Sequence, residues 1–209
     1  LYLSINKNRE EFMKQIVFAS NNKGKINEVK AILKDYDILS ISDMEKMLNK
    51  KIIVTENGKT FKANALEKTI SLYNQIGDNY LCIGDDSGIS IDYLNGFPGV
   101  YTARWLDKDD HFKNLELLKK LKGVLKEKRT CHYTTVIALK GKNIIKTFEY
   151  TLDGVISDSP RGENGFGFDE IFELSNGLTL SEIKLKEKVK ISPRKKALMM
   201  IKMYLDEKN

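Results

Sequence analysis

The sequence predicts an α/β fold with a mixed β-sheet, on three observations. In the first half of the chain, short apolar runs alternate with segments whose apolar residues recur every three or four positions, which indicates strands followed by helices. Two long segments rich in β-branched and aromatic residues follow, at 129–139 and 144–156. The turn 140–143 joins them and indicates a hairpin. Strand–helix alternation followed by a hairpin predicts both parallel and antiparallel pairing.

Each element has its own pattern. The predicted buried strands before the hairpin are the apolar runs 16–19, 52–54 and 81–83. The predicted helices carry apolar residues at helical spacing and cover 26–33, 61–73, 112–121 and 192–204. Thr60 is a suitable N-cap for the second helix, and Gly123 is placed to end the third. The glycine-rich stretch 157–170 is predicted to be a loop.

Length and composition indicate the class of protein. The 209 residues suffice for one sizeable core or two small lobes, and 41% hydrophobic with 31% charged residues is typical of a soluble globular protein. We expect a polar lead-in at 1–14 and a single domain at 15–209. No apolar run approaches the roughly 18 residues of a membrane helix, and no signal-peptide pattern precedes the first strand. Cys82 and Cys131 lack metal-binding spacing, so we expect reduced core cysteines in a cytoplasmic protein.

The net charge of +6 is concentrated near the C-terminus, where residues 181–209 hold nine Lys or Arg against four Asp or Glu. Such a segment suits a polyanionic ligand, either nucleic acid or a nucleoside triphosphate. A stacking surface for nucleic acid requires aromatic residues interleaved with the basic ones, and here they are not interleaved. A solvated helix face accounts for most of these lysines.

Two segments after predicted strands carry polar residues. SNNKGK, residues 20–25, forms either an ordinary turn or a site where backbone N–H groups and lysines meet phosphate. It lacks the Gly and the Ser or Thr of a Walker A loop. GDDSG, residues 84–88, follows the predicted strand 81–83. Its Asp85 and Asp86 either ligate a hard cation such as Mg²⁺, orient a water, or bond backbone N–H groups in a strand-capping turn.

Two later segments also leave alternatives open. GENGFGFD, residues 162–169, does not have the glycine order of the dinucleotide fingerprint, and its phenylalanines either offer a face to a flat ring or belong to the core. In ISPRKKAL, residues 191–198, Ser and Pro make a favourable helix start. The three basic residues that follow crowd the positive end of the helix macrodipole. A bound anion would relieve that conflict; otherwise they are solvated cations.

The order of five segments along the chain is specific to one protein family. SNNKGK, ENG-TF-ANA-K, GDDSG-GFPGVY-AR, GENGFGFD and EK-ISPR, between about residue 16 and about residue 205, resemble the family of inosine/xanthosine triphosphate pyrophosphatases. The resemblance implies hydrolysis of purine nucleoside triphosphates with non-standard bases (ITP, dITP, XTP) to the monophosphate and pyrophosphate. It implies Mg²⁺, which Mn²⁺ can replace, an elongated α/β fold with two lobes around a nucleotide cleft, and a homodimer. No membrane or nucleic-acid partner is expected.

The resemblance also implies roles for residues at matching positions. Asp86 matches the proposed proton acceptor and metal ligand, and Lys68 matches a helix lysine that reaches the triphosphate. Asp85 and Glu56 are the further expected metal ligands, and Asp85 and Lys68 are counted as catalytic together with Asp86. The implied substrate-binding residues are Ser20, Asn21, Asn22, Lys23, Gly24, Lys25, Ser87, Phe166, Gly167, Phe168, Asp169, Lys188, Ser192 and Arg194.

The chain departs from the family pattern at four places. Ser20 and Asn21 replace the usual Thr and Gly, and Phe168 replaces a common Tyr. Ala63 stands where many bacterial members have Glu, so a metal ligand is either missing or supplied by Glu56. Pro193 replaces the usual His, which removes an imidazole that would read the purine edge. Two alternatives therefore stay open: a related triphosphate pyrophosphatase with a different base preference, and a basic nucleic-acid-binding module.

Overall fold

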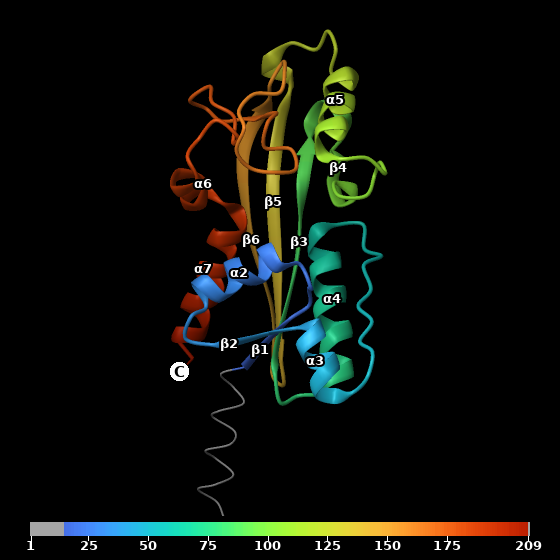
Figure 1. Cartoon of the computed structure of the whole chain (residues 1–209), viewed down its shortest axis with the longest axis vertical. Helices are drawn as coiled ribbons and strands as arrows, with labels where there is room; N and C mark the ends of the chain where they lie inside the picture. Colours follow the sequence, from blue (N-terminus) through green and yellow to red (C-terminus); the bar gives the residue numbers. More distant parts are fainter. Residues whose placement is uncertain (1–14, 209) are drawn as a thin grey trace, which may run out of the picture. The chain divides into compact units, whose positions relative to one another are not determined.

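The computed structural model describes residues 15–208, so the predicted polar lead-in at 1–14 lies outside it (Figure 1). The described chain forms two compact units. Unit 1 comprises residues 15–86, 136–149 and 194–208, and unit 2 comprises 87–135 and 150–193. That 15–209 act as one domain stays a prediction. None of the helices in residues 15–208 combines the length and the apolarity needed to cross a membrane.

The strands form a mixed sheet, as the sequence predicts. In chain order they are β1 (Gln15–Phe18), β2 (Asp37–Ser40), β3 (Leu81–Ile91), β4 (Phe97–Pro98), β5 (Thr130–Gly141), β6 (Ile144–Ile156) and β7 (Phe172–Glu173). The order across the sheet is β2-β1-β3-β5-β6-β7, with β4 beside β3. β1 is parallel to β2 and β3, whereas the β3–β4 and β6–β7 pairs are antiparallel. The predicted hairpin is confirmed as β5 and β6.

The predicted helices are confirmed, with small shifts at their ends. The α-helices are α2 (Lys23–Ile32), α3 (Ile41–Leu48), α4 (Phe61–Ile76), α5 (Asp110–Lys120), α6 (Leu185–Ile191) and α7 (Pro193–Asp206), and the 3₁₀ turns are η1 (Asp92–Leu94), η2 (Gly99–Tyr101) and η3 (Lys126–Lys128). Thr60 caps α4 by accepting a hydrogen bond from the Ala63 N–H. Sequence patterning did not predict β2, α3 or α6, because segments of four, eight and seven residues are too short to show a clear period.

In unit 1, helices cover both faces of the parallel strands. Successive residues of a strand point to opposite faces. Ile16 and Phe18 of β1 pack in one cluster with residues of α2 and α7, while Val17 packs in another with residues of α3 and α4. Figure 1 shows these two pairs of helices on opposite sides of β1. Burial on both faces explains why β1 has a continuous apolar sequence.

A separate core fills unit 2. β3, α5 and β7 contribute Ile89, Leu117 and Phe172 to it, together with Cys131. Cys82 belongs to the cluster between β1, α3 and α4 in unit 1. Both cysteines are free and buried, and burial raises the pKa of the Cys82 thiol to about 12. The prediction of reduced core cysteines is confirmed.

The predicted strand at 52–54 is wrong. This segment bonds to helix side chains instead of a neighbouring strand. The Ile53 N–H donates to Gln75 Oε1 at 3.1 Å, and the Ile53 carbonyl accepts from Ser71 Oγ at 3.0 Å. The Ile52 N–H donates to Glu45 Oε1 at 2.9 Å. Because side chains of α3 and α4 satisfy this backbone, the apolar run needs no strand partner.

Candidate active site

The aspartates of GDDSG lie within a strand and not after one. β3 continues from Leu81 through Asp85 and Asp86 to Ile91, so the predicted strand end at Ile83 and the alternative of a strand-capping turn are both wrong. Gly and Asp are depleted in strands, and here buried polar partners compensate for their low propensity. Adjacent strand residues point to opposite faces of a sheet, so the two buried carboxylates have different surroundings.

Asp85 is held by two cations that come from distant parts of unit 1. Its Oδ1 accepts a hydrogen bond of 3.1 Å from Lys25 Nζ of α2, and its Oδ2 accepts one of 2.9 Å from Arg194 Nε of α7. Arg194 also donates through Nη1 to Glu28 at 3.0 Å. Burial raises the pKa of Asp85, but the charges of Lys25, Arg194 and Lys68 outweigh it and lower the pKa to about 2. Asp85 is therefore ionised and ties β3 to α2 and α7.

Asp86 has a different set of partners. Lys68 Nζ of α4 lies 3.8 Å from Asp86 Oδ1, and Asn64 Nδ2 donates to Oδ2 at 2.9 Å. The same lysine lies 3.3 Å from Glu56 Oε1, so two carboxylates share one ammonium group. Burial raises the pKa of Asp86 to about 6, opposed by Lys68 and Asn64 and reinforced by the nearby Glu56. A carboxyl with a pKa near neutrality is suited to accept and release a proton.

Helix α4 delivers two polar partners of Asp86. Asn64 and Lys68 are four residues apart, so they lie on the same face of the helix, and both are buried. β3 approaches α4 closely at Gly84, where a Cβ would lie 2.6 Å from Thr69 Oγ1. The Oδ1 atom of Asn64 is buried and accepts no hydrogen bond from the described residues. A buried oxygen without a donor is a natural contact for water or a ligand.

Glu67 fastens the loop that carries Glu56 to α4. Asn57 donates to the Glu67 carboxylate through its backbone N–H at 2.8 Å and through its Nδ2 at 3.1 Å. The Asn57 N–H is the main cause that lowers the pKa of Glu67, and the Thr55 hydroxyl and the Gly58 N–H also contribute. One carboxylate thus holds residues on both sides of Glu56. Sequence reasoning did not identify Glu67 or Asn64.

Residues 20–25 begin helix α2. Ser20 Oγ accepts a hydrogen bond of 3.1 Å from the Asn22 N–H, and Asn22 Oδ1 caps the helix by accepting one of 3.1 Å from the Lys25 N–H. Asn21 Oδ1 accepts from the backbone of α3 at 2.9 Å. The exposed residues of this segment are Asn21, Asn22, Lys23 and Gly24. The segment is ordered by its own side chains, and phosphate binding there stays a prediction.

In unit 2, the loop after β6 exposes an aromatic ring. Phe166 is 69% exposed, and Lys188 Nζ of α6 lies 4.9 Å from its ring centroid. Lys188 also pairs with Asp169, whose Oδ2 accepts a hydrogen bond of 2.8 Å from the Phe166 N–H. Burial raises the pKa of Asp169, and its bond to Lys188 opposes that shift. The exposed ring can stack on a flat ligand.

The remaining predicted substrate contacts in unit 2 have other partners. The Phe168 ring packs against Tyr133, with centroids 4.8 Å apart, and joins the core of the unit. The Ser87 hydroxyl lies 2.9 Å from the Thr135 hydroxyl. Ser192 lies between α6 and α7. Contact of these residues with substrate stays a prediction.

Comparison with known proteins identifies the family. The sequence model of the Ham1 family matches residues 16–204. The chain belongs to the Ham1 family. This match confirms the resemblance that the order of the five motifs indicated.

Named relatives of this Ham1 chain are similar over nearly their whole length. A dITP/XTP pyrophosphatase of Bacillus licheniformis is 38% identical over 202 residues, which are 93% of this chain and 100% of the relative. One from Campylobacter jejuni is 37% identical over 199 residues, 91% and 96% of the two chains. Among solved structures, the Ham1 protein of Staphylococcus aureus has a TM-score of 0.84 at 34% identity and covers 93% of this chain and 100% of its own. The mixed α/β fold is therefore that of solved Ham1 proteins.

One departure from the Ham1 pattern has a structural counterpart. Ala63 occupies the position where many bacterial members have Glu, and Glu67 lies one helical turn later on the same face of α4. A Cβ at Gly58 would lie 2.6 Å from the Ala63 Cβ, so the loop that carries Glu56 lies directly against this turn of α4. One sequence signal could have identified Glu67: it is a carboxylate four residues after Ala63, and it directly precedes Lys68.

The carboxylates of this Ham1 chain fit a divalent cation that also binds substrate. Within residues 15–208, no three His, Cys, Asp or Glu side chains form a metal-binding group. Glu56 and Asp86 nevertheless lie on the same lysine, with oxygens 3.3 and 3.8 Å from Lys68 Nζ, so the two carboxylates are close together. Mg²⁺ is commonly held by one or two carboxylates together with substrate phosphates. The donor set therefore suits a metal that arrives with a triphosphate.

Proposed function

We propose that this chain hydrolyses purine nucleoside triphosphates with non-standard bases, such as ITP, dITP and XTP, to the monophosphate and pyrophosphate. The observation that carries the proposal is the arrangement of Glu56 and Asp86 around Lys68 in unit 1. Relatives that share this chain's length and 37–38% of its residues are named dITP/XTP pyrophosphatases, which supports the same substrate class here.

We propose Mg²⁺ as the cofactor, which Mn²⁺ can replace, with Glu56 and Asp86 as its protein ligands. The two carboxylates that lie beside Lys68 offer oxygen ligands of the kind that Mg²⁺ prefers. When bound, the metal would polarise the triphosphate and lower the pKa of a coordinated water. Asp85 is less suited as a ligand, because Lys25 and Arg194 already engage its two oxygens.

Asp86 is the proposed proton acceptor. Its raised pKa of about 6 places it where a carboxylate is still ionised at neutral pH yet basic enough to take a proton from water. The water oxygen forms a bond to the α-phosphorus, the bond from that phosphorus to the β-bridging oxygen breaks, and pyrophosphate leaves. Lys68 places a buried positive charge where the leaving phosphates gain charge.

Phe166 and Lys188 of unit 2 are the proposed base contacts. The exposed ring of Phe166 offers a stacking surface, and the Lys188 ammonium offers a donor. A keto oxygen at C6 of hypoxanthine or xanthine accepts from such a donor, whereas the amino group of adenine does not, so ATP should be a poor substrate. Arg194 is bonded to Asp85 and Glu28, and we assign it to holding Asp85 and thereby Lys25.

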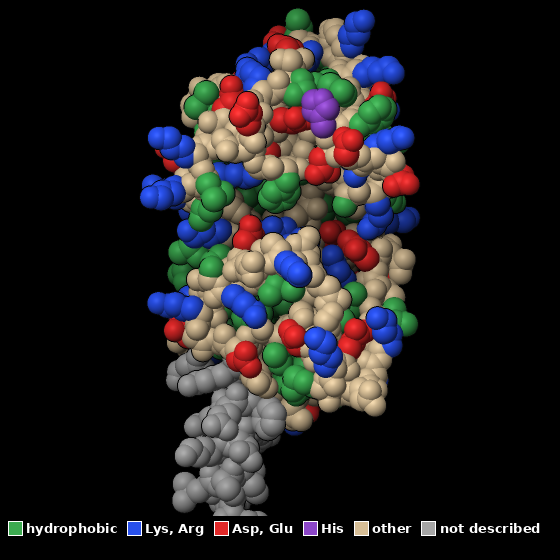
Figure 2. All heavy atoms as spheres, viewed as in Figure 1, with side chains coloured by type: hydrophobic (Ala, Val, Ile, Leu, Met, Phe, Trp, Pro, Cys, Tyr) green, Lys and Arg blue, Asp and Glu red, His purple; other side chains and the backbone are tan. Residues whose placement is uncertain are grey.

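A homodimer working in the cytoplasm completes the proposal. The family resemblance supports the homodimer, and the two free, buried cysteines support the cytoplasm, where thiols stay reduced. The nucleic-acid alternative has less support, since on the face shown in Figure 2 the Lys and Arg side chains are interspersed with Asp and Glu.

Pyrophosphate release from a panel of nucleoside triphosphates tests the proposal. We expect release from ITP, dITP and XTP with Mg²⁺, little from ATP, and none with excess chelator. Asp86→Asn should abolish turnover while the variant still folds. Release from modified pyrimidine triphosphates only would favour the related nucleotidase with another base preference. Absence of release from every triphosphate, together with steeply salt-dependent binding to long nucleic acid, would overturn the proposal.

A further inference from the structure

Two glycines flank Phe166 in the loop that presents its ring. Phe166 lies between Gly165 and Gly167, whose φ angles are +100° and +65°. Glycine adopts such angles without steric cost, and by the same freedom it moves out of them easily. The ring itself is 69% exposed and so is not anchored by a surrounding core. If the ring is to meet a ligand in one orientation, contacts to the backbone of the loop must fix its position.

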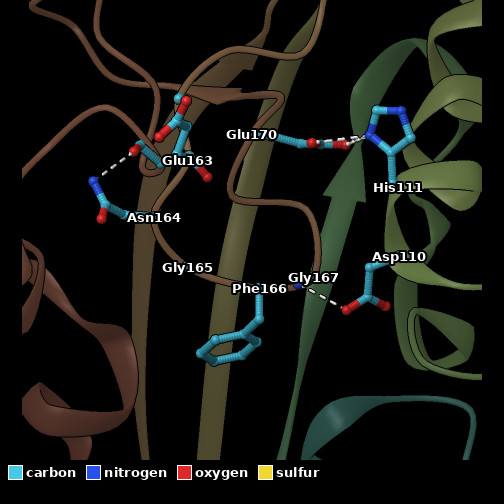
Figure 3. A pocket seen from close by; sticks show the side chains of 10 residues that line it. Asp110, His111, Glu163, Asn164, Gly165, Phe166, Gly167 and Glu170 are labelled. Carbon is cyan, nitrogen blue, oxygen red and sulfur yellow. Dashed lines mark hydrogen bonds and ion pairs between the residues drawn. The ribbon is translucent and has the colours of Figure 1, made fainter.

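The Phe168 ring anchors the loop to the core of unit 2, but apolar packing does not fill the space between the loop and α5. A cavity of about 260 Å³ lies between the first turn of α5 and the loop. Its lining is largely polar and includes Asp110, His111, Glu163 and Glu170. Figure 3 shows α5 on one side of this cavity and the loop with Phe166 and Gly167 on the other. Hydrogen bonds that cross the rim of the cavity therefore hold this part of the loop to α5.

Three residues of α5 bond to the loop. His111 Nδ1 lies 2.9 Å from Glu170 Oε1, whereas Asp110 and Asn114 both bond to Gly167. Its N–H donates to Asp110 Oδ2 at 2.9 Å, and its carbonyl accepts from Asn114 Nδ2 at 2.7 Å. Asn114 is buried and also donates to Glu170 Oε1 at 3.0 Å, which ties it to the far end of the loop. Figure 3 shows the bond from Gly167 to Asp110. Both polar groups of one glycine are thus held by one helix.

A hydrogen bond within the loop completes the restraint around Phe166. Its N–H donates to Asp169 Oδ2 at 2.8 Å. The peptide before Phe166 is therefore fixed from within the loop, and the peptide after it is fixed from α5. A binding group whose backbone is fixed in advance loses less freedom when the ligand arrives, which strengthens binding.

We propose that Asp110 and Asn114 are positioning residues for base recognition: they hold Gly167 and thereby set where the Phe166 ring stands. They touch the loop and not the reacting phosphates, so they act through Phe166. The inference rests on the proposed function, in which this ring contacts the purine. It predicts that loss of either residue weakens the hold on the base and leaves the chemistry at the phosphates unchanged.

The test compares Asp110→Ala and Asn114→Ala with wild-type protein in three measurements. We expect the KM for ITP and the inhibition constant of inosine monophosphate to rise about fivefold in each variant, the size expected for one lost hydrogen bond. The inhibition constant of pyrophosphate, which has no base, should not change, and kcat should change less than twofold. A merely structural defect would alter the pyrophosphate constant and kcat as well.

Two control variants sharpen the result. Asp110→Asn keeps an oxygen that can accept from Gly167 and should retain the wild-type KM. Glu116→Gln, on the same helix, removes an exposed ion pair with Lys119 and should change nothing. Asp110 is half exposed, so its variants test the inference even if Asn114→Ala does not fold. Unchanged inosine monophosphate binding in Asp110→Ala, or an equal rise in the pyrophosphate constant, overturns the inference. If wild-type protein releases no pyrophosphate, the proposed function is overturned instead.

Discussion

Replacing Asp86 by Asn should abolish catalysis and yet stabilise the metal-free protein at neutral pH. The carboxyl is buried beside Glu56, and its pKa is raised from the ordinary 3.8 to about 6. The folded state then holds a proton between about pH 4 and pH 6 that the unfolded state has released. Wild-type stability therefore falls as pH rises through this range and stays lower above it. The difference between the two pKa values corresponds to about 3 kcal/mol, at about 1.4 kcal/mol per pH unit.

The Asn variant lacks this ionisation, and its amide oxygen can still accept the hydrogen bond from Asn64. Lys68 keeps Glu56 as a partner. The free energy of unfolding of Asp86→Asn, relative to wild type, should therefore rise by about 3 kcal/mol between pH 4 and pH 7.5. Urea denaturation in the presence of a chelator, at several pH values, measures this difference.

Excess Mg²⁺ supplies a second comparison. A ligand that binds only the folded state raises its stability, so wild type should gain thermal stability with Mg²⁺ and Asp86→Asn should gain less. The reasoning is refuted if the variant is less stable than wild type at pH 7.5 without metal, or if the difference between the two proteins does not depend on pH.

Three further predictions concern other residues. Asp85→Asn should lower the free energy of unfolding by about 3 kcal/mol at pH 7, because Lys25 and Arg194 lose a buried partner; a loss below about 1 kcal/mol in urea denaturation would contradict the role given to Asp85. Pro193→His should change the ratio of ITP to ATP or GTP turnover by at least about fivefold, since one base contact contributes about 1–3 kcal/mol of discrimination; an unchanged ratio means that the position does not read the base. Hydrogen bonds to Asp153 and Asp92 raise the pKa of His132, so its contribution to stability is present below about pH 6 and lost as pH rises through the raised pKa. The melting temperature of His132→Gln should accordingly equal that of wild type above about pH 8 and be lower at pH 5.5. A difference in melting temperature that does not change with pH would exclude this linkage.

Sequence patterning predicted the elements that carry many periodic residues. β1 and the hairpin β5–β6 were predictable because burial on one or both faces leaves a clear apolar pattern, and α4 because Thr60 marks its start. The segment 52–54 was wrongly predicted to be a strand. Its backbone N–H groups bond to side chains of α3 and α4, and no local sequence pattern reveals such contacts. β3 was predicted too short because GDDSG has low strand propensity, which its buried ion pairs outweigh.

The chemistry-bearing residues were predictable from motif order, but their partners were not. Asp85 bonds to Arg194, which lies 109 positions away, and Gly167 bonds to Asn114 across 53 positions. Contacts over such separations depend on the fold and leave no periodic signal. The different surroundings of Asp85 and Asp86 follow from the strand itself, which turns adjacent side chains to opposite faces.

Hydrolysis of ITP in water enriched with ¹⁸O tests the central claim most directly. The account predicts that one labelled oxygen enters inosine monophosphate and that the released pyrophosphate carries none, because water attacks the α-phosphorus. Mass spectrometry of the two products measures the label. Label in the pyrophosphate, or release of labelled orthophosphate, would contradict the account.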